Sequence, residues 1–483
     1  MITLLISIAA LILGYLVYGS FVARVFAPDA AAITPAYSKQ DGVDYVPMPA
    51  WKVFMIEFLN IAGTGPIFGA ILDAMYGPAC YFWIVFGCIF GGAVHDYFSG
   101  MLSLRHGGAS LPELVGEYLG KGARTVMRVF AVLMLMLVGA VFVYSPALIL
   151  GGMTGGTTTA TLIWVGVVLV YYMIATMVPI DKIIGRIYPV FAIALVFMAL
   201  SLLVCLIGKW PSGVPEVWDG LQNRAPQLGG IFPGMFISIA CGAVSGFHAT
   251  QSPLMARCIK NEKLGRPVFY GSMILEGVVA LIWATVSAYF FYGGGAADMG
   301  AEGVTAAPAV VTTVSKHWLG AFGSVLALLG VVAAPITSGD TALRSVRLMV
   351  CEAFGLRQKT VGDRLKVCIP IFLLVGALLT FNILDSKGFD VIWRYFGWAN
   401  QTLSIFTFWT ITVFLARRRG GLTFLMTMLP ACFMSAVCVS FICTARIGFN
   451  LPSAWAPYIG AVTFVLAAAL FLLWHRKNKN STL

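Results

Sequence analysis

The chain has 483 residues, of which 59% are hydrophobic and only 11% are charged, and its formal net charge is +11. A soluble globular domain carries about 25% charged residues, so this composition excludes an ordinary soluble protein. The basic residues occur in short clusters between apolar stretches, which is typical of membrane-protein loops, so no nucleic-acid partner is expected.

Apolar stretches separated by glycine, proline and charged residues predict an all-α polytopic membrane protein. At about 20 apolar residues per span, a chain of this length has room for roughly 12 to 14 transmembrane helices. We predict thirteen, at about 2–25, 51–72, 79–103, 127–150, 159–179, 187–208, 230–252, 267–292, 318–343, 365–383, 391–415, 422–445 and 456–474. The first stretch lacks the basic region and the cleavage site of a signal peptide, so we expect it to remain as a helix.

Alternate loops are rich in basic residues, so the positive charges gather on one side of the predicted membrane. One side collects the basic clusters within 105–128, 182–186, 257–266, 344–366, 417–419 and 476–479. The other side has few basic residues and carries the acidic loop with Asp298 and Glu302. Because cytoplasmic loops are the basic ones, the amino terminus is predicted outside and the carboxyl terminus in the cytoplasm.

Two of the predicted spans contain sequences that interrupt a helix. The second includes Ile61-Ala-Gly-Thr-Gly-Pro66, and the seventh includes Ala240-Cys-Gly-Ala-Val-Ser-Gly-Phe-His248. Backbone groups freed in hydrocarbon cost several kcal/mol each unless the segment lines a polar cavity or packs inside the protein. Close helix packing at the glycines is the alternative explanation.

The two interruptions lie about 180 residues apart, in spans that begin on opposite sides of the membrane. Paired breaks of this kind indicate a five-plus-five inverted-repeat transporter core with its site near the midplane. We expect 1–50 to form an N-terminal helix and a cytoplasmic connection, 51–208 the first repeat and 230–415 the second. Residues 416–483 then form two C-terminal helices and a cytoplasmic tail.

Several motifs carry a resemblance to a known family. They are Ile61-Ala-Gly-Thr-Gly-Pro-Ile, Gly92-Ala-Val-His-Asp96-Tyr, Gly246-Phe-His-Ala-Thr-Gln-Ser-Pro253, Ile336-Thr-Ser-Gly-Asp340 and Phe396-Gly-Trp-Ala-Asn-Gln401. Along nearly its whole length the chain resembles the carbon starvation protein A (CstA) family. The resemblance implies a transporter of the bacterial inner membrane, related to the amino acid–polyamine–organocation superfamily and associated with uptake of peptides or pyruvate during nutrient limitation. Longer members carry two histidines where this chain has Ile56-Glu57, and they extend further at the carboxyl end.

The two breaks supply the first candidates for substrate binding. The amino terminus of a half-helix presents free N–H groups and a positive dipole, which suit a carboxylate. We expect Gly63, Thr64 and Gly65 to contribute in this way, with Ser245 and Gly246 opposite them.

Four polar side chains extend this predicted site. His248 and Gln251 are three residues apart and share a helix face, and the imidazole could bind a carboxylate or carry a proton. Asn400 and Gln401 can donate and accept, which suits a carboxylate or a peptide amide. A packing role for His248 and helix–helix hydrogen bonds for the two amides are the alternatives.

The resemblance also implies a place for a coupling ion. In the inverted-repeat fold the helix that contains Thr337 and Ser338 supplies hydroxyl ligands to sodium, and backbone carbonyls near Ala62 and Gly65 would complete the site. Hydrogen bonding between helices is the other explanation for the two hydroxyls. No cofactor is expected apart from sodium or a proton as the coupling ion, and no metal site is expected apart from this one.

Embedded charges give further candidates, because a carboxylate in a membrane needs a partner or a function. Asp340 and Arg344 have ion-pair spacing and could form a latch near the cytoplasmic gate, or Asp340 could carry a proton. His95 and Asp96 point about 100° apart on a helix, so we expect no dyad between them, although either could titrate.

A few other residues are noted without an assigned role. Glu57 and Glu276 are also embedded acids, and Phe68, Tyr97 and Phe247 could close gates. The ten cysteines include no CxxC pair and are interpreted as packing residues.

These features favour a secondary active transporter, a proton- or sodium-coupled symporter that imports a small carboxylate such as pyruvate. A peptide transporter is the alternative within transport, and a membrane nutrient sensor without net transport is the alternative outside it. No HExxH, GxSxG or GxxxxGK[ST] motif occurs, so neither an enzyme nor a primary pump is expected. The expected partners are a small molecule and the lipid bilayer.

Overall fold

The computed structural model describes the chain except residues 181–183, 240, 385–387, 419–420 and 479–483. Every regular element in that part is a helix. The main helices are α1 (Ile2–Leu13), α2 (Gly19–Phe26), α3 (Pro35–Ser38), α4 (Ala50–Ile61), α5 (Ala70–Ala74), α6 (Ala79–Phe82), α7 (Ala93–Arg105), α8 (Leu111–Leu119), α9 (Lys121–Met153), α10 (Thr158–Met177), α11 (Ile184–Lys209), α12 (Phe236–Ser238), α13 (His248–Ala256), α14 (Gly271–Tyr292), α15 (Gly295–Asp298), α16 (Ala307–Ala327), α17 (Ala333–Phe354), α18 (Val361–Leu384), α19 (Gly388–Arg418), α20 (Leu425–Thr444) and α21 (Ala456–Asn478).

Within the described residues, nine helical segments are long and apolar enough to cross a membrane. They are Ile2–Phe26, Ala79–Arg105, Lys121–Met153, Thr158–Met177, Ile184–Lys209, Glu262–Tyr292, Val361–Phe381, Leu425–Thr444 and Ser453–Asn478. A tenth span is formed if Ala50–Ile61 and Gly65–Ala74, which are bent by 50°, are counted together. The polytopic all-α prediction is confirmed, and the count of thirteen spans stays a prediction.

The predicted ninth span is part of a longer helical path. α16, the π-helical segment η9 (Leu328–Val332) and α17 follow one another from Ala307 to Phe354 without an intervening loop. The path turns at Gly320, where φ is +61° and ψ is −148°. Side chains larger than hydrogen rarely adopt this backbone conformation, so a glycine permits the turn.

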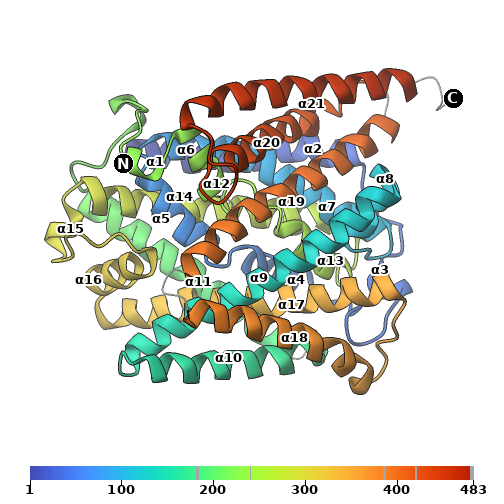
Figure 1. Ribbon diagram of the computed structural model, residues 1–483, viewed down its shortest axis with the longest axis horizontal. Helices are drawn as coiled ribbons and strands as arrows, with labels where there is room; N and C mark the ends of the chain where they lie inside the picture. The colour runs from blue at the N-terminus through green and yellow to red at the C-terminus, as the bar shows by residue number, and fades with distance from the viewer. Residues whose placement is uncertain (181–183, 240, 385–387, 419–420, 479–483) are drawn as a thin grey trace.

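The helices beside the two predicted interruptions lie in the interior of the molecule. α4 packs against α11, α5 against α14, and α13 against α7, while α17 lies along α9. In Figure 1, α20 and α21 form one edge of the molecule, and α10 and α18 lie at the opposite edge. The breaks are therefore surrounded by protein and not by lipid, which satisfies the condition for irregular backbone at membrane depth.

The two ends of the chain lie toward opposite ends of the long axis of the molecule. In Figure 1, α1 begins at one end of this axis, near α6 and α15, whereas α21 ends at the other, beyond α8. Which end faces the cytoplasm stays a prediction.

The loop of residues 28–49 folds against the helix ends on one side of the molecule. Its Asp44 is buried and pairs with two arginines of α17, Arg344 at 2.9 Å and Arg347 at 3.0 Å. The Met48 amide donates to the Cys258 carbonyl at 3.1 Å, which ties the loop to the end of α13. The loop, which precedes the first predicted repeat, is thus fastened to two helices of the second, α13 and α17.

The charges around Asp44 set its protonation. Burial alone would raise the pKa of the Asp44 carboxyl, but the positive charges of Arg347, Arg344 and Arg257 outweigh burial and hold that pKa well below its usual range. A depressed pKa in the folded protein means that ionised Asp44 stabilises the fold above the pKa of the unfolded chain.

The third span approaches the seventh so closely that only glycine fits. A Cβ atom added to Gly92 would lie 2.2 Å from the carbonyl oxygen of Ala243, a backbone atom that cannot swing aside. Gly166 in the middle of α10 faces open space instead, with no atom within 4 Å of its added Cβ. The two glycines therefore provide a matched pair for testing this contact.

We predict that Gly92→Ala destabilises the protein by about 1–3 kcal/mol, the usual cost of overpacking. Gly166→Ala should leave stability unchanged or raise it slightly, because alanine favours a helix. Thermal unfolding of the detergent-purified variants measures the difference. Equal unfolding midpoints for both variants would contradict the packing described here.

We predict that Asp44→Asn lowers stability by roughly 3 kcal/mol, because it leaves two buried guanidinium groups without a counter-charge. The loss should be constant above about pH 5, since an unfolded Asp titrates near pH 4. It should shrink only as the pH falls further and the wild-type carboxylate is protonated. Asp298→Asn, at the exposed end of α15, is the control. A deficit that grows toward acid pH would refute the assignment.

Candidate functional site

The first break separates α4 from the helical segment η2 (Gly65–Gly69). Residues 62–64 are not helical, and their side chains are buried. A Cβ on Gly65 would lie 2.2 Å from Cys241 of the seventh span, and one on Gly63 would lie 3.0 Å from the Ser338 hydroxyl. The first break therefore contacts both the second break and α17.

The second break lies between α12 and α13, and its residues 241–247 are buried and not helical. The Phe247 amide donates to Asn400 Oδ1 at 2.6 Å, and Asn400 Nδ2 donates to the Ser245 hydroxyl at 3.1 Å. Gln401 Nε2 donates to the Phe236 carbonyl at 2.9 Å. Asn400 and Gln401 on α19 thus form hydrogen bonds with the interrupted segment, in agreement with the alternative explanation of helix–helix hydrogen bonding. Contact of these two side chains with substrate stays a prediction.

Close approach also fixes Gly246. A Cβ on this residue would lie 2.2 Å from the Asn400 carbonyl oxygen and 2.4 Å from Leu403 Cβ. The glycine is required by the packing of the break against α19. Packing alone therefore explains why residue 246 is a glycine, whether or not a ligand binds there.

Buried charged side chains gather beside the second break. His248 Nδ1 lies 2.9 Å from Asp96 Oδ2, and His95 Nδ1 lies 2.8 Å from Asp96 Oδ1. His248 Nε2 faces Glu276 Oε2 at 3.7 Å. The expectation that His95 and Asp96 form no dyad is wrong, because their side chains are in hydrogen-bond contact. Their part in ion coupling stays a prediction.

Two further predicted residues lie close to this cluster. Glu57 of α4 accepts a hydrogen bond at 2.8 Å from Ser252, one turn beyond His248. Gln251 donates to the Thr250 hydroxyl at 2.8 Å. The structure thus brings the first predicted break, the second break and α7 together around His248.

The predicted sodium ligands are partly brought together. Ser338 donates to the carbonyl oxygens of Asn60 at 3.0 Å and Leu59 at 3.2 Å. The Thr337 hydroxyl donates to Ala334 within its own helix, at 2.8 Å. The carbonyls that meet α17 therefore precede Ala62, because α4 continues to Ile61 before it breaks.

The predicted ion pair between Asp340 and Arg344 is not formed. Asp340 Oδ2 accepts a hydrogen bond from Tyr188 of α11 at 2.6 Å. Arg344 pairs with Asp44, and its Nη2 donates to the carbonyls of Ala175 and Val178. The loop of residues 28–49 supplies a carboxylate that the spacing within α17 could not reveal. The ion pairs observed here are those of Asp44 with Arg344 and Arg347, and a latch at the cytoplasmic gate stays a prediction.

Several buried polar atoms without a hydrogen-bond partner lie at or near the two breaks. Among the described residues, they include Glu57 Oε2, Asn60 Oδ1 and Nδ2, Thr64 Oγ1, Gln251 Oε1 and Gln401 Oε1. An unsatisfied buried group costs about 1–3 kcal/mol and is rare in native proteins. The unpartnered atoms at the breaks are therefore available to solvent, an ion or a substrate.

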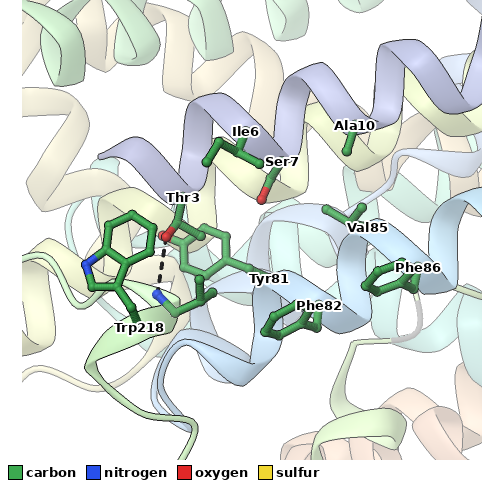
Figure 2. A pocket seen from close by; sticks show the side chains of 10 residues that line it. Thr3, Ile6, Ser7, Ala10, Tyr81, Phe82, Val85, Phe86 and Trp218 are labelled. Atoms are coloured by element: carbon green, nitrogen blue, oxygen red, sulfur yellow. Dashed lines mark hydrogen bonds between the residues drawn. The ribbon is translucent and has the colours of Figure 1, made fainter.

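A surface groove elsewhere does not compete with this site. It measures about 150 Å³ and lies between α1 and the span that begins with α6, with Trp218 at one end (Figure 2). Its lining is mostly apolar, with polar side-chain groups on Thr3, Ser7, Tyr81 and Trp218. Thr3 Oγ1 accepts from the Val217 amide at 3.2 Å. Neither break contributes a residue to this groove.

Relatives with known names include several membrane proteins. An uncharacterized membrane protein of Haemophilus influenzae is 42% identical over 332 residues, covering 59% of this chain and 90% of that protein. The peptide transporter CstA of Campylobacter jejuni is 26% identical over 550 residues, covering 89% and 78%. The pyruvate/proton symporter BtsT of Escherichia coli is 28% identical over 338 residues, covering 57% and 47%.

Two solved structures share the fold. A Na⁺-coupled sialic acid symporter in a substrate-bound outward-open state has a TM-score of 0.51 at 13% identity, covering 95% of this chain and 96% of that one. MhsT in complex with L-phenylalanine has a TM-score of 0.55 at 14% identity, covering 86% and 98%. The predicted inverted-repeat transporter fold is thereby confirmed.

The family model described as carbon starvation protein CstA matches residues 1–210, 153–317 and 294–441, which together span most of the sequence. The motifs at both breaks fall within these ranges. The chain belongs to the CstA carbon starvation protein family.

Proposed function

We propose that the chain is a secondary active transporter that imports a small carboxylate such as pyruvate across the bacterial inner membrane. The observation that carries the proposal is the meeting of two interrupted spans, Gly65 against Cys241, amid buried polar atoms without partners. Paired breaks near the midplane are where carriers of this fold class bind their cargo. The family and the names of the relatives support the same activity.

The breaks offer chemistry for a carboxylate. η2 starts at Gly65 and α13 starts at His248, so each presents a half-helix amino terminus inside the protein. Such termini attract negative charge through their N–H groups and dipole. Thr64 Oγ1, without a partner among the described residues, adds a hydroxyl donor at the first of them.

A short peptide is the second candidate. Relatives named peptide transporters match this chain over a larger share of their length than the pyruvate/proton symporter does, 78% against 47%. A peptide would, however, require the tightly packed breaks to separate further than a three-carbon acid would. The close contact of Gly65 with Cys241 therefore favours the smaller cargo.

Two residues of α17 could couple transport to an ion gradient. Ser338 faces two carbonyl oxygens of α4, and hard oxygen ligands of this kind suit sodium. Asp340 is buried, bonds to Tyr188 through one oxygen and has no partner for the other among the described residues, which suits a proton carrier. The relative from Escherichia coli is named a proton symporter, and the sialic acid symporter is named Na⁺-coupled.

The direct test is uptake of labelled pyruvate into proteoliposomes under an imposed pH or sodium gradient. We expect accumulation above equilibrium with one of the two gradients, and competition by other small carboxylates. Competition by peptides alone would favour the second candidate. Binding without accumulation under either gradient would contradict transport and identify a sensor.

Single substitutions identify the coupling ion. If sodium drives uptake, Ser338→Ala should weaken the apparent sodium affinity at least tenfold, and if protons do, Asp340→Asn should remove the pH dependence. Ser201→Ala is the matched control, because its hydroxyl bonds only to the Phe197 carbonyl of its own helix at an exposed position. Ion dependence that is unchanged in both α17 variants would eliminate these assignments.

A further inference from the structure

Three potential metal ligands converge beside the second break. They are the Cys241 thiol in the non-helical segment, the imidazole of His248 at the start of α13, and the Glu276 carboxylate in α14. One ligand atom from each lies within 4.8 Å of the others, and all three residues are buried. Residues 35 positions apart are thus brought to one point by the break.

The spacing is close to that of an occupied site. Ligand bonds of about 2.0–2.3 Å in a tetrahedral zinc site place neighbouring ligand atoms roughly 3.3–3.7 Å apart. His248 Nε2 and Glu276 Oε2 are already 3.7 Å apart. The ligand atom of Cys241 lies within 4.8 Å of the ligand atoms of the other two residues, so the set is completed by an approach of about 1 Å.

The atoms that would bind the ion are those that lack partners. His248 Nε2 and both carboxylate oxygens of Glu276 have no hydrogen-bond partner among the described residues. Cys241 Sγ makes one long contact of 3.7 Å to the Ser245 hydroxyl. A buried polar group left in this condition needs an explanation, and a bound ion satisfies all of these atoms together.

An outer shell around His248 is also present. Its Nδ1 lies 2.9 Å from Asp96 Oδ2, and the other oxygen of Asp96 lies 2.8 Å from His95 Nδ1. A metal-binding histidine commonly donates its second ring N–H to a carboxylate, which fixes the tautomer and directs the free nitrogen lone pair at the metal. With Nδ1 donating to Asp96, Nε2 is that free nitrogen.

The charges of the three ligands match a divalent ion. A thiolate and a carboxylate carry two negative charges, so a divalent ion with a neutral imidazole forms a neutral unit, which a low-dielectric interior favours. On binding, the thiol proton of Cys241 and the carboxylic acid proton of Glu276 leave. Sulfur and imidazole ligands select zinc and similar transition metals over magnesium and calcium.

We propose that Cys241, His248 and Glu276 form a binding site for a divalent transition-metal ion of the zinc class, with a fourth coordination position left open. The ion joins the second break to α14 and thereby restrains the seventh span. This site does not depend on the proposed substrate or coupling ion. Under this proposal Cys241 is a metal ligand, whereas the other nine cysteines keep their interpretation as packing residues.

Metal content of the purified, tag-free protein tests the proposal. After equilibration with zinc and removal of excess metal, we expect one more zinc ion per chain in the wild type than in Cys241→Ser. Cobalt substitution should give a thiolate-to-cobalt absorption band that Cys241→Ser lacks. Cys438→Ser is the matched control, since Cys438 is a buried cysteine of α20 that is not one of the three converging ligands. It should bind metal as the wild type does.

A second measurement separates lost metal from lost folding. Zinc should raise the unfolding temperature of the wild type and of Cys438→Ser. Zinc should also bind at least tenfold more weakly to Glu276→Gln than to the wild type, and an unchanged gel-filtration profile shows that this variant is folded. Magnesium should have no effect. Absence of bound zinc in the wild type, or equal zinc content in Cys241→Ser and Cys438→Ser, would overturn the site whether or not the protein transports pyruvate.

Discussion

The fold depends on one constraint, which is that the backbone groups of two interrupted helices must find partners away from lipid. Residues 62–64 and 241–247 leave the helical path in the protein interior. In hydrocarbon this would cost several kcal/mol for each unpaired group, so the segments are stable only where other polar groups reach them. The surrounding helices supply those groups.

Each break is held by hydrogen bonds from a helix elsewhere in the chain. α19 reaches the second break through Asn400, which bonds the Phe247 amide, and Gln401, which bonds the Phe236 carbonyl. α17 reaches the first break through Ser338, which bonds the carbonyls of Leu59 and Asn60. Because these bonds tie each break to a helix from another part of the chain, a movement of either break would be transmitted to α17 or α19.

The sequence was sufficient for features that depend on local composition. The glycines and the proline of the first break, Gly63, Gly65 and Pro66, predicted where the helix stops, and the glycine-rich segment before His248 did so for the second. The family could also be inferred from motifs, because motifs are contiguous. The number of spans could not be established, since broken and charged helices do not satisfy a simple test of length and hydropathy.

Side-chain partners were predicted less well, because they depend on tertiary contacts. Helical spacing paired Asp340 with Arg344, yet Arg344 pairs with Asp44, 300 positions away, in a loop without a recognisable motif. Spacing also separated His95 from Asp96, although their side chains are in hydrogen-bond contact. Cys241 and Glu276 carried no signal of their proximity, because only the folded break brings them to His248.

The central claim is that the second break lines the path of the substrate. Thiol labelling of Cys241 in metal-depleted protein by a small water-soluble maleimide, measured peptide by peptide by mass spectrometry during turnover, tests it most directly. The account predicts that Cys241 is labelled and that pyruvate slows the labelling, while buried Cys438 in α20 is unaffected by pyruvate. A Cys241 that stays unlabelled in actively transporting protein, or that is labelled at the same rate with and without substrate, would contradict it.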